Sequence, residues 1–134
     1  DAAGNLSSAS SNSVTLDTTA PTVTFNPLNN ATEAGRRANI TITFSEAVRK
    51  IDDSELTDSN IDSLITLKED DNNGSNIAFD ATINGGKTVI TIDPTPRLES
   101  EGFVYVGIGA TVEDSVGNAI TASSATFKTC KSCD

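Results

Sequence analysis

Alternation of apolar and polar residues is the feature that most constrains how this chain can fold. Seven short stretches carry apolar side chains at every second position, which is the period of a β-strand and not of a helix. Glycine, proline, asparagine and aspartate gather between these stretches, as they do at turns. The predicted strands cover residues 22–25, 39–44, 64–68, 77–83, 89–93, 102–110 and 124–129.

The large side chains are spread thinly over these strands. Five of the seven strands contain one phenylalanine each, which suits a core enclosed between two sheets about 10 Å apart. Residues 102–110 are apolar enough to predict a central strand covered on both faces. Residues 49–63 are the one segment in which we expect a short helical turn. Short antiparallel strands with long crossings predict an all-β, Greek-key β-sandwich of about seven strands.

Two kinds of connection are predicted between the strands. The pairs Asn73-Gly74 and Asn84-Gly85 predict hairpin turns, because Asn-Gly readily adopts the positive φ angles that such turns need. Residues 93–102 contain two prolines, which cannot donate a ladder hydrogen bond. We therefore expect a longer crossing loop there.

The beginning of the chain repeats its end. When Asp1–Leu16 is laid over Asp114–Thr129 without gaps, six positions are identical, from Asp1/Asp114 to Ser11/Ser124. A period of whole-domain size indicates tandem domains and not a solenoid, whose repeats are shorter. We interpret residues 1–16 as the terminal strand of a preceding domain, 17–21 as a linker and 22–129 as the sandwich. Residues 130–134 would then begin a cysteine-containing segment.

Composition excludes several classes of function. The chain has 134 residues, a formal net charge of −10 and no histidine. Binding to nucleic acid or to anionic membranes needs clustered lysine and arginine, so neither partner is expected. No stretch is long and apolar enough to span a bilayer. The serines have no histidine to activate them, and the carboxylates of residues 52–58 lie in a polar loop, so we expect no enzyme.

Several longer stretches resemble the bacterial Ig-like repeats of large secreted and surface-anchored adhesins. They are "DTTAPTVTFNP", "NITITFSEAV", "SNIDSLITLKE", "FDATINGGKTVITIDP" and "VEDSVGNAITASSATF". The resemblance covers nearly all of residues 17–128 and implies an Ig-like sandwich in a tandem array outside the cell. It also implies a non-catalytic module that acts as a spacer and assembly unit, with neighbouring repeats as partners and a possible cell-surface or glycan ligand.

Calcium is the best cofactor candidate, because it prefers oxygen ligands from carboxylates, amides and carbonyls. The turn "EDSVGN" offers Glu113, Asp114 and Asn118, and Asp1, Asn5 and Asp17 would act in the same way at the other end. Similar adhesin repeats are often rigidified by calcium at such junctions. The alternative is a purely structural turn, in which Asp114 caps the turn and Gly117 adopts a left-handed conformation.

Cys130 and Cys133 stand in a C-x-x-C spacing, which fits a redox motif, half of a zinc site or a disulfide. A redox motif needs the start of a helix, and zinc needs two further ligands. In an exported chain, "TCKSCD" resembles the start of a furin-like cysteine-rich segment. The two cysteines would then bond to each other or to partners beyond Asp134.

Four sequons predict glycosylation sites at Asn5, Asn30, Asn39 and Asn73. They leave open a second function, as a repeat of an extracellular glycoprotein filament joined by strand addition through residues 1–16. A third is a carbohydrate-binding accessory module. We disfavour it because sugar platforms need exposed aromatic rings and this chain has few.

Overall fold

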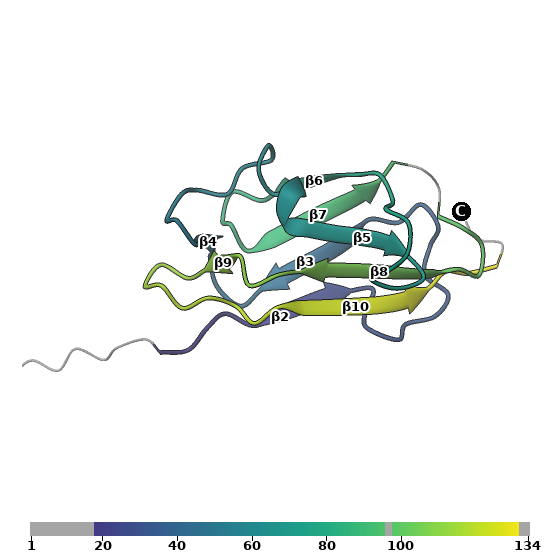
Figure 1. Cartoon of the computed structure of the whole chain (residues 1–134), viewed down its shortest axis with the longest axis horizontal. Helices are drawn as coiled ribbons and strands as arrows, with labels where there is room; N and C mark the ends of the chain where they lie inside the picture. The colour runs from purple at the N-terminus through teal and green to yellow at the C-terminus, as the bar shows by residue number, and fades with distance from the viewer. Residues whose placement is uncertain (1–17, 96–97, 132–134) are drawn as a thin grey trace, which may run out of the picture.

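The computed structural model describes residues 18–95 and 98–131, which fold into two antiparallel sheets packed face to face (Figure 1). The larger sheet has the order β2-β3-β7-β6, with bounds Val23–Asn26, Ile40–Phe44, Val89–Pro94 and Phe79–Ile83. The smaller sheet has the order β10-β8-β5, with bounds Ser123–Lys128, Phe103–Ile108 and Ile65–Glu69. The short strands β4 (Arg49–Lys50) and β9 (Val112–Glu113) pair separately, and η1 (Asp62–Leu64) is a 3₁₀ turn.

The connections make this an Ig-like sandwich. The chain changes sheet three times, between β3 and β5, between β5 and β6, and between β7 and β8. Strands β2–β3, β6–β7 and β8–β10 are neighbours within a sheet. Four strands against three in this order is the arrangement of the seven-stranded Ig fold. The predicted fold class is confirmed.

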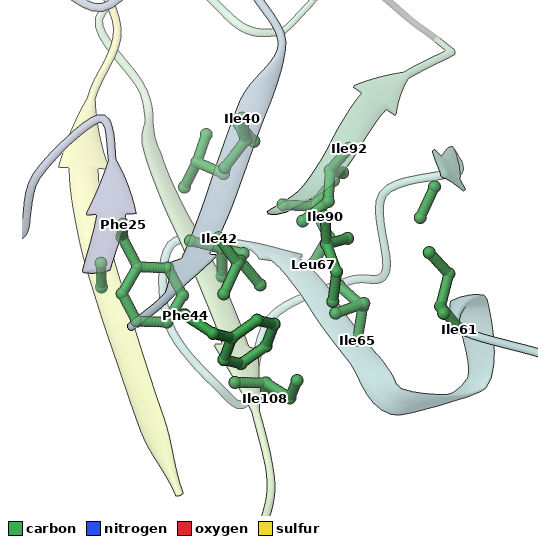
Figure 2. Close-up of a cluster of buried hydrophobic side chains, with 14 of the residues drawn as sticks. Phe25, Ile40, Ile42, Phe44, Ile61, Ile65, Leu67, Ile90, Ile92 and Ile108 are labelled. Atoms are coloured by element: carbon green, nitrogen blue, oxygen red, sulfur yellow. The ribbon is translucent and has the colours of Figure 1, made fainter. Parts of the chain in front are cut away.

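The core lies between the two sheets, where alternate side chains of both converge (Figure 2). Ile40, Ile42 and Phe44 project inward from β3, as the alternation predicts, and the intervening threonines stay outside or half-buried. Ile90 and Ile92 project from β7, and Leu67 comes from β5 in the opposite sheet. Each such side chain contributes about 1.5–3 kcal/mol by leaving water, so this layer accounts for the cohesion of the sheets.

Strand β8 differs from its prediction in one respect. It is the central strand of the smaller sheet, as expected, but only one of its faces is fully covered. Val104, Val106 and Ile108 point into the core, whereas Phe103 is 51% exposed on the outer face. The alternation within β8 places Phe103 outside, so the expectation that both faces are covered was wrong.

The two predicted hairpin turns form without positive φ at their glycines. Between β6 and β7, Lys87 N–H donates to Asn84 O (3.1 Å), and Lys87 carries the positive φ of 58°. A type I turn followed by a left-handed residue makes this geometry. In the turn after β5, Asp70 and not Gly74 has the positive φ, at 68°. The turn at 70–76 also leads into the opposite sheet, so β5 and β6 do not form a regular hairpin.

The sandwich has two poles at the ends of its long axis. The N-terminal pole consists of residues 45–64, 84–88 and 109–122, and the C-terminal pole of residues 27–39, 70–78 and 98–102. The described chain enters at the N-terminal pole and leaves at the C-terminal pole (Figure 1). None of the described segments forms a helix that is long and apolar enough to cross a membrane.

Candidate functional site

The turn at Asp114 is built around a buried carboxylate. Asp114 is 0% exposed, and its Oδ1 accepts hydrogen bonds from the N–H groups of Val116 (3.0 Å) and Asn118 (2.8 Å). Its Oδ2 accepts a hydrogen bond from Asn118 Nδ2 (2.9 Å). Gly117 has a φ of 95°, which L-residues other than glycine adopt at a cost. Aspartate, glycine and asparagine at this spacing therefore close the turn through their own side chain and backbone.

Glu113 is also buried, but it faces a cation. Its Oε2 lies 2.9 Å from Arg49 Nε and 2.8 Å from Arg49 Nη2. Arg49 Nη2 also contacts Asp53 Oδ1 at 2.9 Å. These contacts join β4 to β9 through side chains as well as through the backbone, since Arg49 is also the ladder partner of Glu113. The ion pair thus fastens the long 45–64 segment to β9 within the N-terminal pole.

Glu113, Asp114 and Asn118 do not by themselves fit a calcium ion. Glu113 is bound to a guanidinium group, and both oxygens of Asp114 face N–H donors, which repel a cation. Within residues 18–95 and 98–131, no group of three or more carboxylate, cysteine or histidine side chains could hold a metal. Asp1, Asn5 and Asp17 lie outside the described residues. The calcium site therefore stays a prediction that depends on them.

The carboxylates of the 52–58 loop all have structural partners. The Ser54 hydroxyl and amide hydrogen bonds lower the pKa of Asp52, whereas a general acid needs a raised pKa. Asp53 contacts Arg49, and Glu55 Oε2 lies 3.3 Å from Lys87 Nζ. Asp58 accepts a backbone hydrogen bond from β6. These contacts shape the loop and do not bring two carboxylates together around a substrate.

At the C-terminal pole, Thr129 is a buried polar residue that the sequence did not single out. Its Oγ1 accepts a hydrogen bond from Gly102 N–H (2.9 Å) and donates to Glu99 O. Cys130 follows, is 4% exposed and is disulfide-bonded, and its N–H donates to Ala34 O (3.0 Å). Cys133 lies outside the described residues. The segment 98–102 is thus held directly against the end of β10.

The described sequon asparagines are all on the surface. Asn30 is exposed in the loop after β2, Asn39 is exposed immediately before β3, and Asn73 is exposed in the turn after β5. Asn5 lies outside the described residues. Exposure makes the three sites accessible, and their glycosylation stays a prediction.

Three of the four outer sheet edges are covered by the protein's own groups. On the free side of β6, the N–H groups of Ala81 and Ile83 donate to Asp62 Oδ1 (3.1 Å) and Asp58 Oδ1 (2.8 Å). Residues 75–77 fold back along β5, where Ile77 N–H donates to Leu67 O (2.9 Å). The loop 29–34 runs along β10 and hydrogen-bonds to Thr126, Lys128 and Cys130.

The fourth edge, β2, is protected by its length and by proline. It has four residues and lies between Pro21 and Pro27, which have no N–H to donate. Short edge strands, proline and inward-directed charges are the means by which sheet proteins avoid pairing with other chains. The edges of this sandwich are therefore poor templates for an added strand.

One cavity at the C-terminal pole was not expected from the sequence. It has a volume of about 210 Å³, and Phe103 is among the residues that line it. The carbohydrate-binding alternative was disfavoured because the chain has few aromatic residues, and Phe103 shows that one of these few is exposed. The ring is not free on all sides, however, since Lys128 Nζ lies 5.8 Å from its centroid.

Comparison with solved structures shows the same fold in proteins of low sequence identity. The chain is similar to CopC from Methylosinus trichosporium OB3b, with 13% identity, a TM-score of 0.56, and coverage of 85% of this chain and 97% of that chain. It is also similar to LD transpeptidase LdtMt1 in complex with imipenem, with 17% identity, a TM-score of 0.50, and coverage of 82% and 40%. A third similar structure is L,D-transpeptidase 1 of Mycobacterium tuberculosis, with 16% identity, a TM-score of 0.49, and coverage of 82% and 39%.

The similarities to CopC and to the imipenem complex show the fold alone. The chain spans about two fifths of the transpeptidase chains that it matches. A search of curated proteins finds no match. The bacterial Ig-like domain family, Big_5, matches residues 17–129, which include all seven main strands. The four-plus-three topology and this match agree, and the chain belongs to the bacterial Ig-like domain family.

Proposed function

We propose that this domain is a non-catalytic spacer of a long extracellular surface or adhesin-type protein, which transmits tension between its two poles. The observation that carries this proposal is the path of the chain, which enters at one end of the long axis and leaves at the other (Figure 1). Domains joined in this way extend as a rod and project whatever they carry away from the surface.

The terminal strands support a role under tension. Both β2 and β10 run from the N-terminal to the C-terminal pole, and each is hydrogen-bonded lengthwise to an inner strand, β3 or β8. Pulling the chain ends apart therefore loads these ladders along the strands, so that many hydrogen bonds must break together. The side-chain and backbone contacts of Thr129 and Cys130 add anchors at the point where the chain leaves.

The covered sheet edges favour a self-contained spacer domain over a filament of domains that exchange strands. Strand addition needs an exposed row of backbone donors and acceptors. Asp58, Asp62 and the 29–34 and 75–77 segments occupy most of those positions on three edges. The filament alternative, in which residues 1–16 add to a neighbouring sheet, would require one of these segments to leave or would be limited to the four-residue edge of β2.

Single-molecule force measurements test the spacer proposal. We expect the domain, pulled from its two chain ends, to unfold in one step and at a higher force than when pulled between its N-terminus and a handle at Gly85. The described chain begins at the N-terminal pole, where Gly85 also lies, so this geometry pulls across the strands of the larger sheet and separates β2 from β3 one pair at a time. Equal forces in the two geometries would contradict a tension-bearing role.

A calcium-loaded junction would strengthen such a spacer, and chelation tests for it. If Asp1, Asn5 or Asp17 complete a site with the Asp114 turn, EGTA lowers the melting midpoint and added calcium restores it. Asp17→Asn should remove the response, whereas Asp93→Asn, an exposed carboxylate in β7, should keep it. A midpoint that does not move with EGTA excludes a structural calcium ion.

A further inference from the structure

A small cavity at the C-terminal pole combines an apolar floor with an acidic rim. Its floor is formed by Ile77, Leu98 and Val104, whose side chains also belong to the hydrophobic core. Phe103 stands beside them, exposed. Glu69, Asp70 and Glu99 line the same cavity and are exposed to solvent, which gives it an acidic rim.

The walls of this cavity are fixed in place by specific contacts. Leu98 and Arg36 hold each other, since Leu98 N–H donates to Arg36 O (2.9 Å) and Arg36 Nε donates to Leu98 O (2.8 Å). On the other side, Asp70 N–H donates to Phe103 O (2.9 Å). The Thr129 hydroxyl hydrogen-bonds to Glu99 O and to Gly102 N–H and so holds this segment against the end of β10. The cavity is therefore preformed and needs little ordering to receive a ligand.

Size and chemistry together select the kind of ligand. A volume of about 210 Å³ is smaller than the pockets of drug-sized molecules, which start at about 300 Å³, and suits a single side chain. An aliphatic stem would bury against Ile77, Leu98 and Val104. A cationic head group would then meet the carboxylates at the rim, because long basic side chains keep their charge at the edge of an apolar contact.

An arginine fits this arrangement better than a lysine. Its planar guanidinium can stack on an aromatic ring and donate to two carboxylate oxygens at once, whereas an ammonium group is a compact point charge. The Phe103 ring already has Lys128 Nζ at 5.8 Å from its centroid, so the preference for arginine rests mainly on the two-oxygen contact with the rim carboxylates. The formal net charge of −10 attracts basic partners over a longer range.

We propose that this cavity binds an arginine side chain presented by a basic partner protein. Binding would give the domain an attachment point at its C-terminal pole. This goes beyond the spacer proposal and does not depend on it, because a rod can transmit tension whether or not this cavity is filled.

Titration with N-acetyl-arginine amide, followed by amide NMR spectra of the domain, tests the proposal. We expect saturable shifts at Ile77, Gly102 and Val104, none at Val116 or Gly117 of the opposite pole, and a dissociation constant of about 1 mM, as suits so small a ligand. N-acetyl-citrulline amide has the same shape without the charge and should bind at least tenfold more weakly. N-acetyl-lysine amide should bind more weakly than the arginine probe.

Three variants distinguish binding in the cavity from general electrostatic attraction to the acidic surface. Phe103→Ala should weaken binding at least fivefold, and so should the double variant Glu69→Gln and Glu99→Gln. Glu55→Gln removes one carboxylate at the opposite pole and should change binding less than twofold. Amide dispersion matching the parent shows that each variant is folded, which is expected because all four side chains lie at the surface.

Several results would overturn the assignment. If the citrulline probe binds as tightly as the arginine probe, the cavity does not recognise the positive charge. If the lysine probe binds more tightly, the cavity does not prefer the guanidinium group. A loss in Glu55→Gln as large as in the double variant would indicate non-specific attraction. Shifts at the cavity with a neutral monosaccharide, and none with arginine, would show a sugar site instead. None of these results bears on the force measurement.

Discussion

At the scale of single residues, one torsion angle decides whether the Asp114 turn can form. Gly117 is the one described glycine with a positive φ, at 95°, and an added Cβ there would meet no atom within 4 Å. Any loss on substitution must therefore come from the backbone and not from a clash. Gly85 offers a matched comparison, because an added Cβ there also meets no atom within 4 Å and its φ is not positive.

We predict that Gly117→Ala lowers the free energy of unfolding by about 1–2 kcal/mol, the cost of a left-handed L-residue. Gly85→Ala should be neutral or slightly stabilising, because alanine reduces the freedom of the unfolded chain. Urea denaturation of both variants measures the difference. Equal stabilities of the two variants would show that the turn relaxes to another conformation.

The sequence predicts the Asp114 turn because all of its determinants are local. Asp114, Gly117 and Asn118 lie within five residues, and their hydrogen bonds join them to each other. The left-handed conformations of Lys87 and Asp70 could not be predicted in this way. Both belong to turns in which an Asn-Gly pair predicted the positive φ at the glycine. With the observed register of the flanking strands, the positive φ falls on a residue a few positions away.

At the scale of elements, the protection of β6 rests on two aspartates from the segment around η1. Asp62 and Asp58 accept hydrogen bonds from successive outward N–H groups of the strand. Backbone donors without partners at a sheet edge invite pairing with another chain. The predicted strand pattern could not show this, because the two contacts join residues 19 and 25 positions apart.

We predict that the double variant Asp58→Ala and Asp62→Ala associates with itself, since it exposes the edge of β6. Sedimentation at increasing concentrations should show dimers or larger species where the parent stays monomeric. The double variant Asp80→Ala and Asp93→Ala removes the same charge from exposed positions of β6 and β7, and should stay monomeric. Association of both double variants would indicate that lost charge, and not the open edge, is responsible.

Thr129 acts at the junction of β10 with the 98–102 segment. Thr129→Val keeps the shape and removes the hydroxyl, leaving Gly102 N–H and Glu99 O with one partner fewer. We predict a loss of about 1–3 kcal/mol, the cost of leaving buried polar groups unsatisfied. Thr126→Val is the control, because only the backbone groups of Thr126 make hydrogen bonds in the structure. A similar loss in both variants would contradict a special role for Thr129.

Strands with strong alternation could be predicted, and short ones could not. Ile40, Ile42 and Phe44 define β3 by themselves, whereas β4 and β9 have two residues each and depend on their pairing with each other. Phe103 was misplaced although the signal was present. Its spacing of one residue from Val104 puts it on the outer face, whereas the apolar run of residues 102–110 suggested that this face is covered as well. The cavity beside it is lined by two connections, residues 70–78 and 98–102, and by the ends of β5 and β8, and it leaves no pattern in the sequence.

At the scale of the whole molecule, charge is the dominant property. A formal net charge of −10 on 134 residues creates repulsion that the folded state concentrates and the unfolded chain relieves. The described ion pairs offset a small part of it, and Lys87–Glu55 is an exposed surface pair of little weight. The same repulsion keeps separate copies apart, which suits a domain whose sheet edges are covered.

We predict that sodium chloride stabilises the domain at neutral pH. Raising its concentration from about 0.01 M to about 1 M shortens the Debye length from about 30 Å to about 3 Å, which screens repulsion between exposed carboxylates. The melting midpoint should rise over this range, and most of the rise should occur below about 0.2 M, where the Debye length changes most. Near pH 4.2, where the net charge is close to zero, the same salt should have little effect. A midpoint that falls with salt at neutral pH would show that specific ion pairs, such as Arg49–Glu113, outweigh the general repulsion.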